Sequence, residues 1–508
     1  MLYIRKHINI IEKSLKNFIF FGFFAIYSLC LTACATLEKQ IQAEYDSDQY
    51  IRTYESIHKA MNTTTNNILL WKMQAGFLTF SYFGPVFSLI ELDNAETIYK
   101  KYEQEGILSS AFNSVAATFS NDMSMSYKGN IYEGSLLNFY KALAYSSLED
   151  SINARIEFNR ANDRQRRAKE YYQKEIAKAH DKAIQNANKK QQSPDYATNT
   201  SDSKINAILT QRYSNLNNFA VYKDLLNPMI PYISGIFFML EKDYTKAIDL
   251  LKESYGITHS NIIANDMMLL ESRQLQEDSN NYTWFIIEDG NISRKQDNSF
   301  STSLLLGGNV ASINLALPSL SEGKSRFKTY KVNTYRADSI AKISALFGSE
   351  FEKQLPIILT RAIISAIVKL VTVEIANHIG GDYGALTGLL TSVIFNAATS
   401  ADTRGSFILP DSVWVARIPN DNNKIAIYGD DTLIINLNFT PNCNSLAKRI
   451  ESHQAFLNLI KQKPKDFHAK INLFKKYKPQ MNICAKTDNI IYIRVHNNVA
   501  TYFTIKGN

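Results

Sequence analysis

Apolar positions recur every three or four residues from residue 35 to about residue 280, and this spacing predicts amphipathic helices over most of that stretch. One polar, low-complexity segment interrupts the pattern at 188–204 (NKKQQSPDYATNTSDSK) and is predicted to be a loop insert. We therefore expect an all-α domain over residues 34–280.

A pattern of small and bulky residues occurs twice in this helical stretch with identical steps of three, nine, four and three residues. The copies are Ala142, Tyr145, Ala154, Phe158 and Ala161, and then Gly235, Phe238, Ala247, Leu251 and Ser254. A small residue one turn before an aromatic lets a partner helix approach closely, so the pattern predicts helix–turn–helix units of the tetratricopeptide-repeat (TPR) kind. A third, weaker copy starts at Phe83, where Pro85 is expected to bend the helix. The wide separation of the copies favours a degenerate array, and an irregular helical bundle is the alternative.

The periodicity changes near residue 281, where short β-branched and apolar runs alternate with Gly, Asn and Ser clusters. The predicted strands are 282–287, 301–306, 311–317, 412–418, 424–428, 432–437, 489–495 and 499–505. Central helices are expected over 337–399, and Gly429 is expected to supply the positive φ of a hairpin turn. The sequence predicts an α+β fold: an N-terminal all-α TPR-like helical domain, then a smaller mixed α/β domain over 281–508 with antiparallel strands.

The apolar run 355–373 is the strongest internal candidate for a membrane span. It carries Arg361 and Lys369, and each cation costs about 2.5–3.5 kcal/mol at the centre of a bilayer. We therefore expect a buried core helix.

The first 33 residues have the order of a secretory signal. Residues 1–17 hold four basic residues and one acid, residues 18–30 are apolar or small, and Leu-Thr-Ala then precedes Cys34. This ending resembles the lipobox of bacterial lipoproteins, which implies cleavage of 1–33 and lipidation of Cys34. By the same resemblance, an Asp directly after the lipidated cysteine would favour retention in the inner membrane. The chain has Ala35 there, which implies an outer-membrane protein that faces the periplasm. An uncleaved membrane anchor is the alternative.

Charge and cysteine content narrow the possible partners. The formal net charge is +8, and part of it lies in the signal, so the remainder is not the excess of a nucleic-acid-binding protein. Beyond Cys34, the mature chain keeps only Cys443 and Cys484. An even pair in an oxidising compartment predicts a disulfide, and two free structural thiols are the alternative.

A basic helical insert is predicted at 440–485. Residues 442–480 contain nine Lys or Arg against Glu451 and Asp466. Such a segment would suit contact with an anionic surface, either lipid head groups or envelope polymers. The alternative is a soluble, charged insert that binds no partner.

The sequence contains no HExxH, CxxC, P-loop, GxSxG or GxGxxG motif, and its eight histidines show no metal-ligand spacing. We therefore expect no enzyme activity, no cofactor and no metal site.

Two polar motifs are the best candidates for a site. Residues that would line a peptide-binding groove are Asn121, Asp122, Tyr127, Tyr132, Glu133, Arg160 and Arg164. The alternative role for these residues is a capping and ion-pair network that fixes the order of the helices. Asp402 and Arg404 would orient a ligand at the edge of the second domain, or form a structural clamp.

Four stretches resemble a family of bacterial lipoproteins with degenerate tetratricopeptide repeats and a C-terminal α/β domain. They are NDMSMSYKGNIYEGSLLNFYKALAY, ARIEFNRANDRQ, EFEKQLPIILTRAIISAIVK and ADTRGSFILP. The segments 188–204 and 440–485 look like insertions, and the residues after Gly405 depart from the family's more frequent Ser-Trp. No activity is established for the family, so the resemblance implies a fold and a cellular location but no catalytic residue.

These observations lead us to expect a membrane-anchored periplasmic scaffold or regulator that binds protein or peptide partners in envelope biogenesis. The alternative is a protein that binds or processes an envelope polymer such as peptidoglycan or another glycan.

Overall fold

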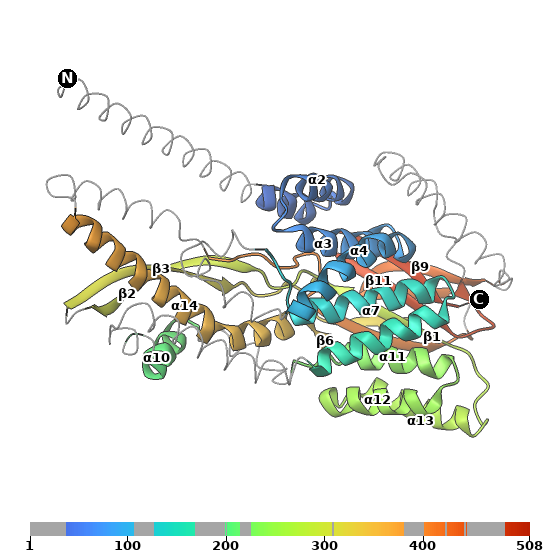
Figure 1. Ribbon diagram of the computed structural model, residues 1–508. Helices are drawn as coiled ribbons and strands as arrows, with labels where there is room; N and C mark the ends of the chain where they lie inside the picture. The colour runs from blue at the N-terminus through green and yellow to red at the C-terminus, as the bar shows by residue number, and fades with distance from the viewer. Residues whose placement is uncertain are drawn as a thin grey trace, which may run out of the picture.

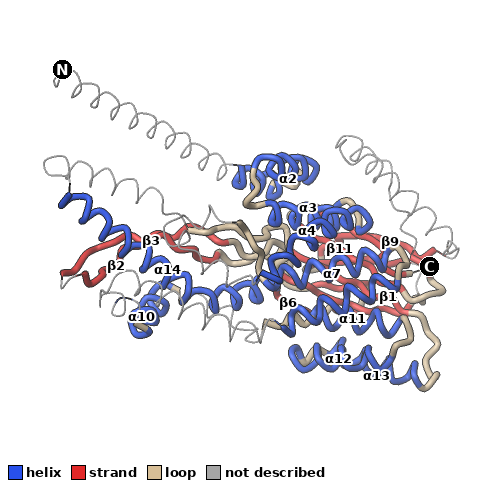
Figure 2. The backbone as a smooth tube through the Cα atoms, viewed as in Figure 1, coloured by secondary structure: helices blue, strands red, loops and turns tan. Residues whose placement is uncertain are grey.

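The computed structural model describes residues 37–105, 126–167, 199, 201–213, 225–306, 309–379, 401–421, 424–440, 443 and 483–507. Helices dominate the chain before residue 280 and strands dominate after it (Figures 1 and 2). The α+β fold class is therefore confirmed.

The N-terminal part is a row of helices that pack one on the next. Its members are helix 37–46, α2 (Tyr50–Thr63), α3 (Ile68–Tyr82), α4 (Pro85–Glu105), α7 (Ile131–Ser147), helix 151–167, α11 (Met229–Leu240), α12 (Tyr244–Thr258) and α13 (Asn261–Gln274). Contacts run from α2 through α3 and α4 to α7, and from α11 through α12 to α13. The rings of Phe158 and Phe237, with centroids 4.8 Å apart, join the two groups.

Each of the two exact spacing copies forms a pair of helices joined by a short turn. The first copy spans α7 and helix 151–167, and the second spans α11 and α12. A Cβ added to Gly235 would lie 2.9 Å from the side chain of Leu251, so glycine permits this close crossing.

The weaker third copy is wrong, because its positions from Val86 onward all lie within the single helix α4. Pro85 does not bend that helix but begins it, at a position where the missing amide proton costs nothing. The helix pair at this point is α3 with α4, and Gly76 faces Leu92 at their crossing.

A five-stranded mixed sheet lies against the row of helices. Its strand order is β12 (Val499–Lys506), β11 (Asn489–His496), β1 (Tyr282–Asp289), β7 (Ser412–Pro419) and β6 (Asp338–Lys342). The expectation of antiparallel strands is only partly right, because β1 pairs in parallel with β11. These two neighbours are buried almost throughout, as is typical of parallel strands.

A second five-stranded sheet covers the opposite face of the first. It contains β10 (Ile483–Cys484), β9 (Thr432–Thr440), β8 (Lys424–Gly429), β4 (Tyr330–Val332) and β5 (Tyr335–Arg336) in that order. Side chains alternate along β1: Trp284 and Ile286 join the core shared with the helices, whereas Phe285 and Ile287 join the core between the sheets. One contiguous core therefore contains residues from both sides of residue 280.

An arm projects away from these layers (Figure 1). It consists of the hairpin β2 (Lys295–Leu306) and β3 (Asn309–Leu320), the long helix α14 (Ile343–Ile379), and α10 (Asp202–Arg212), which packs on α14. In α14, Leu359 and Ile363 are fully buried. Within the described part of the chain, no helix is both long and apolar enough to cross a bilayer.

Two predicted boundaries and one predicted turn residue need correction. The helix expected from 337 starts at Ile343, because residues 338–342 pair with β7 as a strand, and residues 380–400 lie outside the described part. The predicted loop 188–204 ends inside α10, which starts at Asp202. The residues with positive φ in the β8–β9 hairpin are Asp430 and Asp431, not Gly429.

Gly429 is needed in that hairpin for a different reason. A Cβ at this position would lie 2.5 Å from the ring of Phe327, so the close approach of that ring excludes a side chain. Aspartate tolerates the left-handed region better than most residues, and the carboxylate of Asp430 also accepts the amides of Lys328 and Thr329 at 2.9 and 2.8 Å.

Candidate functional site

Part of the first predicted polar motif meets the second in a cluster where the N-terminal end of α7 faces the segment 401–411. Its members Tyr127, Glu133, Asp402 and Arg404 come from stretches about 270 residues apart, and we call it the 133–404 cluster. Asn121, Asp122, Cys34 and most of the basic insert, namely residues 441–442 and 444–482, lie outside the described residues.

Glu133 is the fully buried centre of this cluster. One carboxylate oxygen accepts the backbone amide of Asn130 and the hydroxyl of Tyr127, both at 2.7 Å. The other accepts the backbone amide of Ser406 at 2.9 Å. The contact with the Asn130 amide is half of a capping box at the start of α7, and the contact with the Ser406 amide joins the helix to the 401–411 segment.

Arg404 fills the other half of the cluster. Its guanidinium is almost completely buried and donates to both carboxylate oxygens of Asp402 at 2.8 Å and to the side-chain oxygen of Asn67 at 2.8 Å. It also lies over the ring of Tyr127, 5.5 Å from its centroid. Burial opposes ionisation of Asp402, but the charge and hydrogen bonds of Arg404 outweigh it and hold the Asp402 pKa well below its usual range.

A second carboxylate, which sequence reasoning missed, caps the same helix. Glu350 of α14 accepts the backbone amides of Ile131 and Tyr132 at 2.8 and 3.1 Å. These amides have no partner within α7, and the positive end of the helix dipole favours a carboxylate there. The ring of Tyr132 packs on Phe347 one turn before Glu350. The arm is thereby fixed to the row of helices.

Arg160 and Arg164 belong to a different group, the helical ion-pair network, which lies between α4, α7 and helix 151–167. Arg164 is buried and donates to both carboxylate oxygens of Glu96 and of Glu103, at distances from 2.9 to 3.1 Å. Arg160 is 44% exposed and pairs with Glu157 at 2.6 Å. Glu157 also pairs with the buried amine of Lys141 at 3.1 Å. Arg164 thus connects helices inside the fold instead of facing an open groove.

A third polar group lies between the helices and the first sheet and was not predicted. Glu288 on β1 accepts the hydroxyls of Tyr140 and Tyr492, both at 2.7 Å. Arg494 on β11 donates to the backbone oxygens of Gly290 and Val495 at 2.7 and 2.8 Å. The sequence signal for this group is a charged residue in a mostly apolar strand: Glu288 with Asp289 at the end of YTWFIIED, and Arg494 in NIIYIRVH.

The geometry of these groups favours structural connection over chemistry. Glu133, Arg164, Glu288 and Arg494 are all buried, and each is held by protein groups from another part of the chain. In the part of the chain that the structure describes, no group of three or more His, Cys, Asp or Glu side chains has a metal-binding arrangement.

The free energy of unfolding should depend on pH through the carboxyl group of Glu38. Burial and the nearby Asp402 raise its pKa from 4.5 to about 7, against the opposing effect of Arg404. The folded chain therefore disfavours ionised Glu38, so its contribution to stability falls as the pH rises from about 4.5 through 7. We expect Glu38→Gln to match the wild type near pH 4 and to be more stable above pH 7, by at most about 3 kcal/mol. Urea unfolding at several pH values checks this, with Glu271→Gln at an exposed site as the control. A constant difference across the pH range would contradict it.

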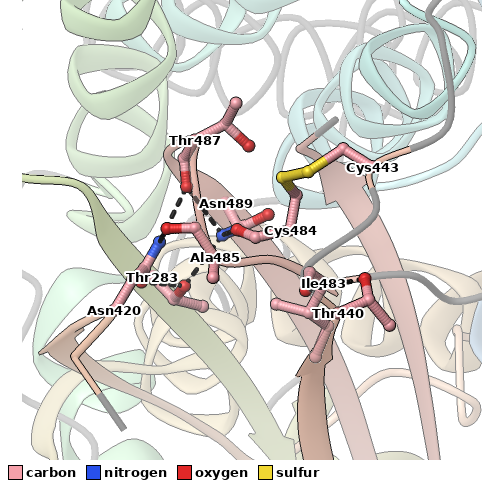
Figure 3. The surroundings of a disulfide bond; sticks show 9 residues. All are labelled: Thr283, Asn420, Thr440, Cys443, Ile483, Cys484, Ala485, Thr487 and Asn489. Atoms are coloured by element: carbon pink, nitrogen blue, oxygen red, sulfur yellow. Dashed lines mark hydrogen bonds between the residues drawn. A yellow bond between two sulfur atoms is a disulfide. The ribbon is translucent and has the colours of Figure 1, made fainter. Parts of the chain in front are cut away.

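A disulfide joins Cys443 to Cys484, just beyond the end of β9 and at the end of β10 (Figure 3). Asn489 holds the adjacent backbone by donating to the carbonyl oxygens of Cys484 and Thr487, both at 2.9 Å. The bond therefore joins the ends of β9 and β10 within the second sheet, and Asn489 of β11 connects this edge to the first sheet.

Alkylation of the exported chain without reductant is expected to leave Cys443 and Cys484 unmodified. Reduction should then lower the free energy of unfolding by about 4 kcal/mol, because the bond closes a separation of 41 residues. Mass spectrometry and urea unfolding provide these measurements. Two alkylated thiols in the untreated protein would contradict the bond.

Comparisons of the chain with protein-family models, with curated proteins and with solved structures gave no match.

Proposed function

We propose that the protein is a lipid-anchored lipoprotein of the bacterial cell envelope, held at the outer membrane through Cys34 and facing the periplasm. In this proposal it acts without catalysis, as a scaffold or regulator that binds a protein or peptide partner. The order of basic, apolar and small residues before Cys34 supports the address. The first described helix begins at residue 37, so a folded body follows the proposed lipidation site almost at once.

The row of helices is the observation that carries the scaffold role. Its two exact spacing copies each form a helix pair, and in the second copy Gly235 permits a close crossing with Leu251, which supports TPR-like character. The buried polar groups of the row, such as Arg164 and Glu133, contact other parts of the same chain. A partner would therefore be bound by the outer surface of the helices. The projecting arm adds a second, elongated surface (Figure 1).

Crosslinking in intact cells followed by mass spectrometry tests the scaffold role. We expect one dominant protein partner with the wild type, and loss of that crosslink with Cys34→Ser, which removes the acceptor for the lipid. Crosslinks to glycan strands alone would instead favour a polymer-binding protein. A protein partner captured equally by both variants would show that the anchor does not bring the two together.

A further inference from the structure

The folded body begins very close to the proposed lipid attachment. Leu37 is the first residue of helix 37–46 and lies three residues after Cys34. Three residues of fully extended chain span at most about 11 Å. A lipidated Cys34 must therefore keep Leu37, the start of helix 37–46, within about that distance of the membrane interface, whatever path the intervening residues take.

Helix 37–46 is part of the body and not a flexible tether. Ile41 and Tyr45 are fully buried, and the Tyr45 hydroxyl donates to the carbonyl of Ile408 at 3.1 Å. At the end of the helix, Arg294 donates to both carboxylate oxygens of Asp46 at 2.6 and 2.7 Å. These contacts reach the segment before β7 and the start of the arm. The position of the helix consequently sets the orientation of the whole protein.

The two ends of the row of helices differ in charge. Helix 37–46 and α2 expose three cations, Lys39, Arg52 and Lys59, against one carboxylate, Asp46, which is paired with Arg294. Their other carboxylates are buried or half-buried: Glu44 lies 3.9 Å from Arg52, and Glu38 and Glu55 are the other two. At the other end of the row, exposed charges around α12 and α13 are net acidic. They are Lys242, Asp249, Lys252, Glu271 and Glu277. Figure 1 shows α2 and α13 at opposite ends.

We infer that the exposed side of helix 37–46 and α2, called here the α2 end, lies directly on lipid head groups, and that α13 is held at the end of the row farthest from the membrane. This inference rests on the proposed lipid anchor at Cys34. Two features support it. One is the short reach from Cys34, and the other is that the exposed charges of the α2 end are three cations against one carboxylate, because anionic head groups attract Lys and Arg close to the surface. The surface at α12 and α13 is then the part presented to partners in the periplasm.

Single labelled cysteines distinguish the two ends. Lys59→Cys places a thiol on the α2 end and Met268→Cys places one on α13, where Met268 is 66% exposed. The disulfide occupies Cys443 and Cys484, and the lipid occupies Cys34, so the new thiol takes the label. The full lipidated chain is inserted into phosphatidylethanolamine–phosphatidylglycerol vesicles that carry a quencher on the lipid head group. We expect at least twofold stronger quenching at position 59 than at position 268.

Arg52→Cys, a second position on the α2 end, guards against a local effect of one substitution and should reproduce the quenching at position 59. Equal quenching at the two ends, or stronger quenching at position 268, overturns the inference while a fatty-acid label on the same preparation leaves the anchor intact. A chain that takes up no fatty acid overturns the anchor and the inference together. The Cys34→Ser chain labelled at position 59 should lose the quenching.

Discussion

Arg164→Ala is expected to lower the free energy of unfolding by about 3–5 kcal/mol, whereas Arg160→Ala should cost less than about 1 kcal/mol. The two arginines lie one turn apart on the same helix, but Arg164 is buried between Glu96 and Glu103, whereas Arg160 is 44% exposed. Loss of Arg164 leaves the buried carboxylate of Glu96 without its main partner. Burial opposes charge on Glu96, and the interaction with Arg164 is what lowers the Glu96 pKa.

Urea unfolding followed by circular dichroism measures both variants. If both variants lost only a little free energy of unfolding, Arg164 would not be needed to hold the helices together. A role for Arg164 in ligand binding would then regain support. A double variant in which Glu96 and Arg164 are both replaced by apolar residues should recover part of the loss, because no buried charge then remains unpaired.

Arg494→Ala should destabilise the protein by a similar amount, about 3–5 kcal/mol, and should affect helices and strands together. Arg494 is fully buried, and its guanidinium donates to Gly290 and Val495 carbonyls and to the Tyr45 hydroxyl at 3.1 Å. Its removal takes one donor from the carbonyl oxygens of Gly290 and Val495 and leaves the nearby Glu288 without its compensating charge.

Calorimetry is the suitable measurement for Arg494→Ala. We expect a single unfolding transition at a lower temperature, since helices and sheet share one core. Arg52→Ala is the matched control, because that side chain is 68% exposed and lies 3.9 Å from Glu44. A variant in which only part of the heat absorption moves would show that the helical row and the sheets unfold independently.

Much of the fold was predictable because its signals are local. All eight predicted strands exist, because alternating or continuous apolar runs between turn residues specify them. Their boundaries lie within about three residues of those expected, except that β2 starts at Lys295 and not at residue 301. The strands β4, β5, β6 and β10 were missed, and they contain only two to five residues. So short a strand has no periodicity of its own and exists because a neighbouring strand pairs with it.

The site was predictable only in pieces. The Asn130–Glu133 capping pair is a local sequence signal, but the contact of Glu133 with Ser406 joins residues 273 positions apart. The parallel pairing of β1 with β11 is similarly distant in sequence, so its direction had no local signal. Glu350 sits in a stretch that resembled a known family, yet its partners are backbone amides at the start of α7, and no sequence pattern identifies these.

The most direct test of the proposed lipid anchor is metabolic labelling with palmitate. We expect that the wild-type chain incorporates the label, that its mature N-terminus is Cys34, and that Cys34→Ser incorporates none. An unlabelled wild-type chain, or equal labelling of the two, would contradict the lipid anchor and with it the proposed place of the protein in the envelope.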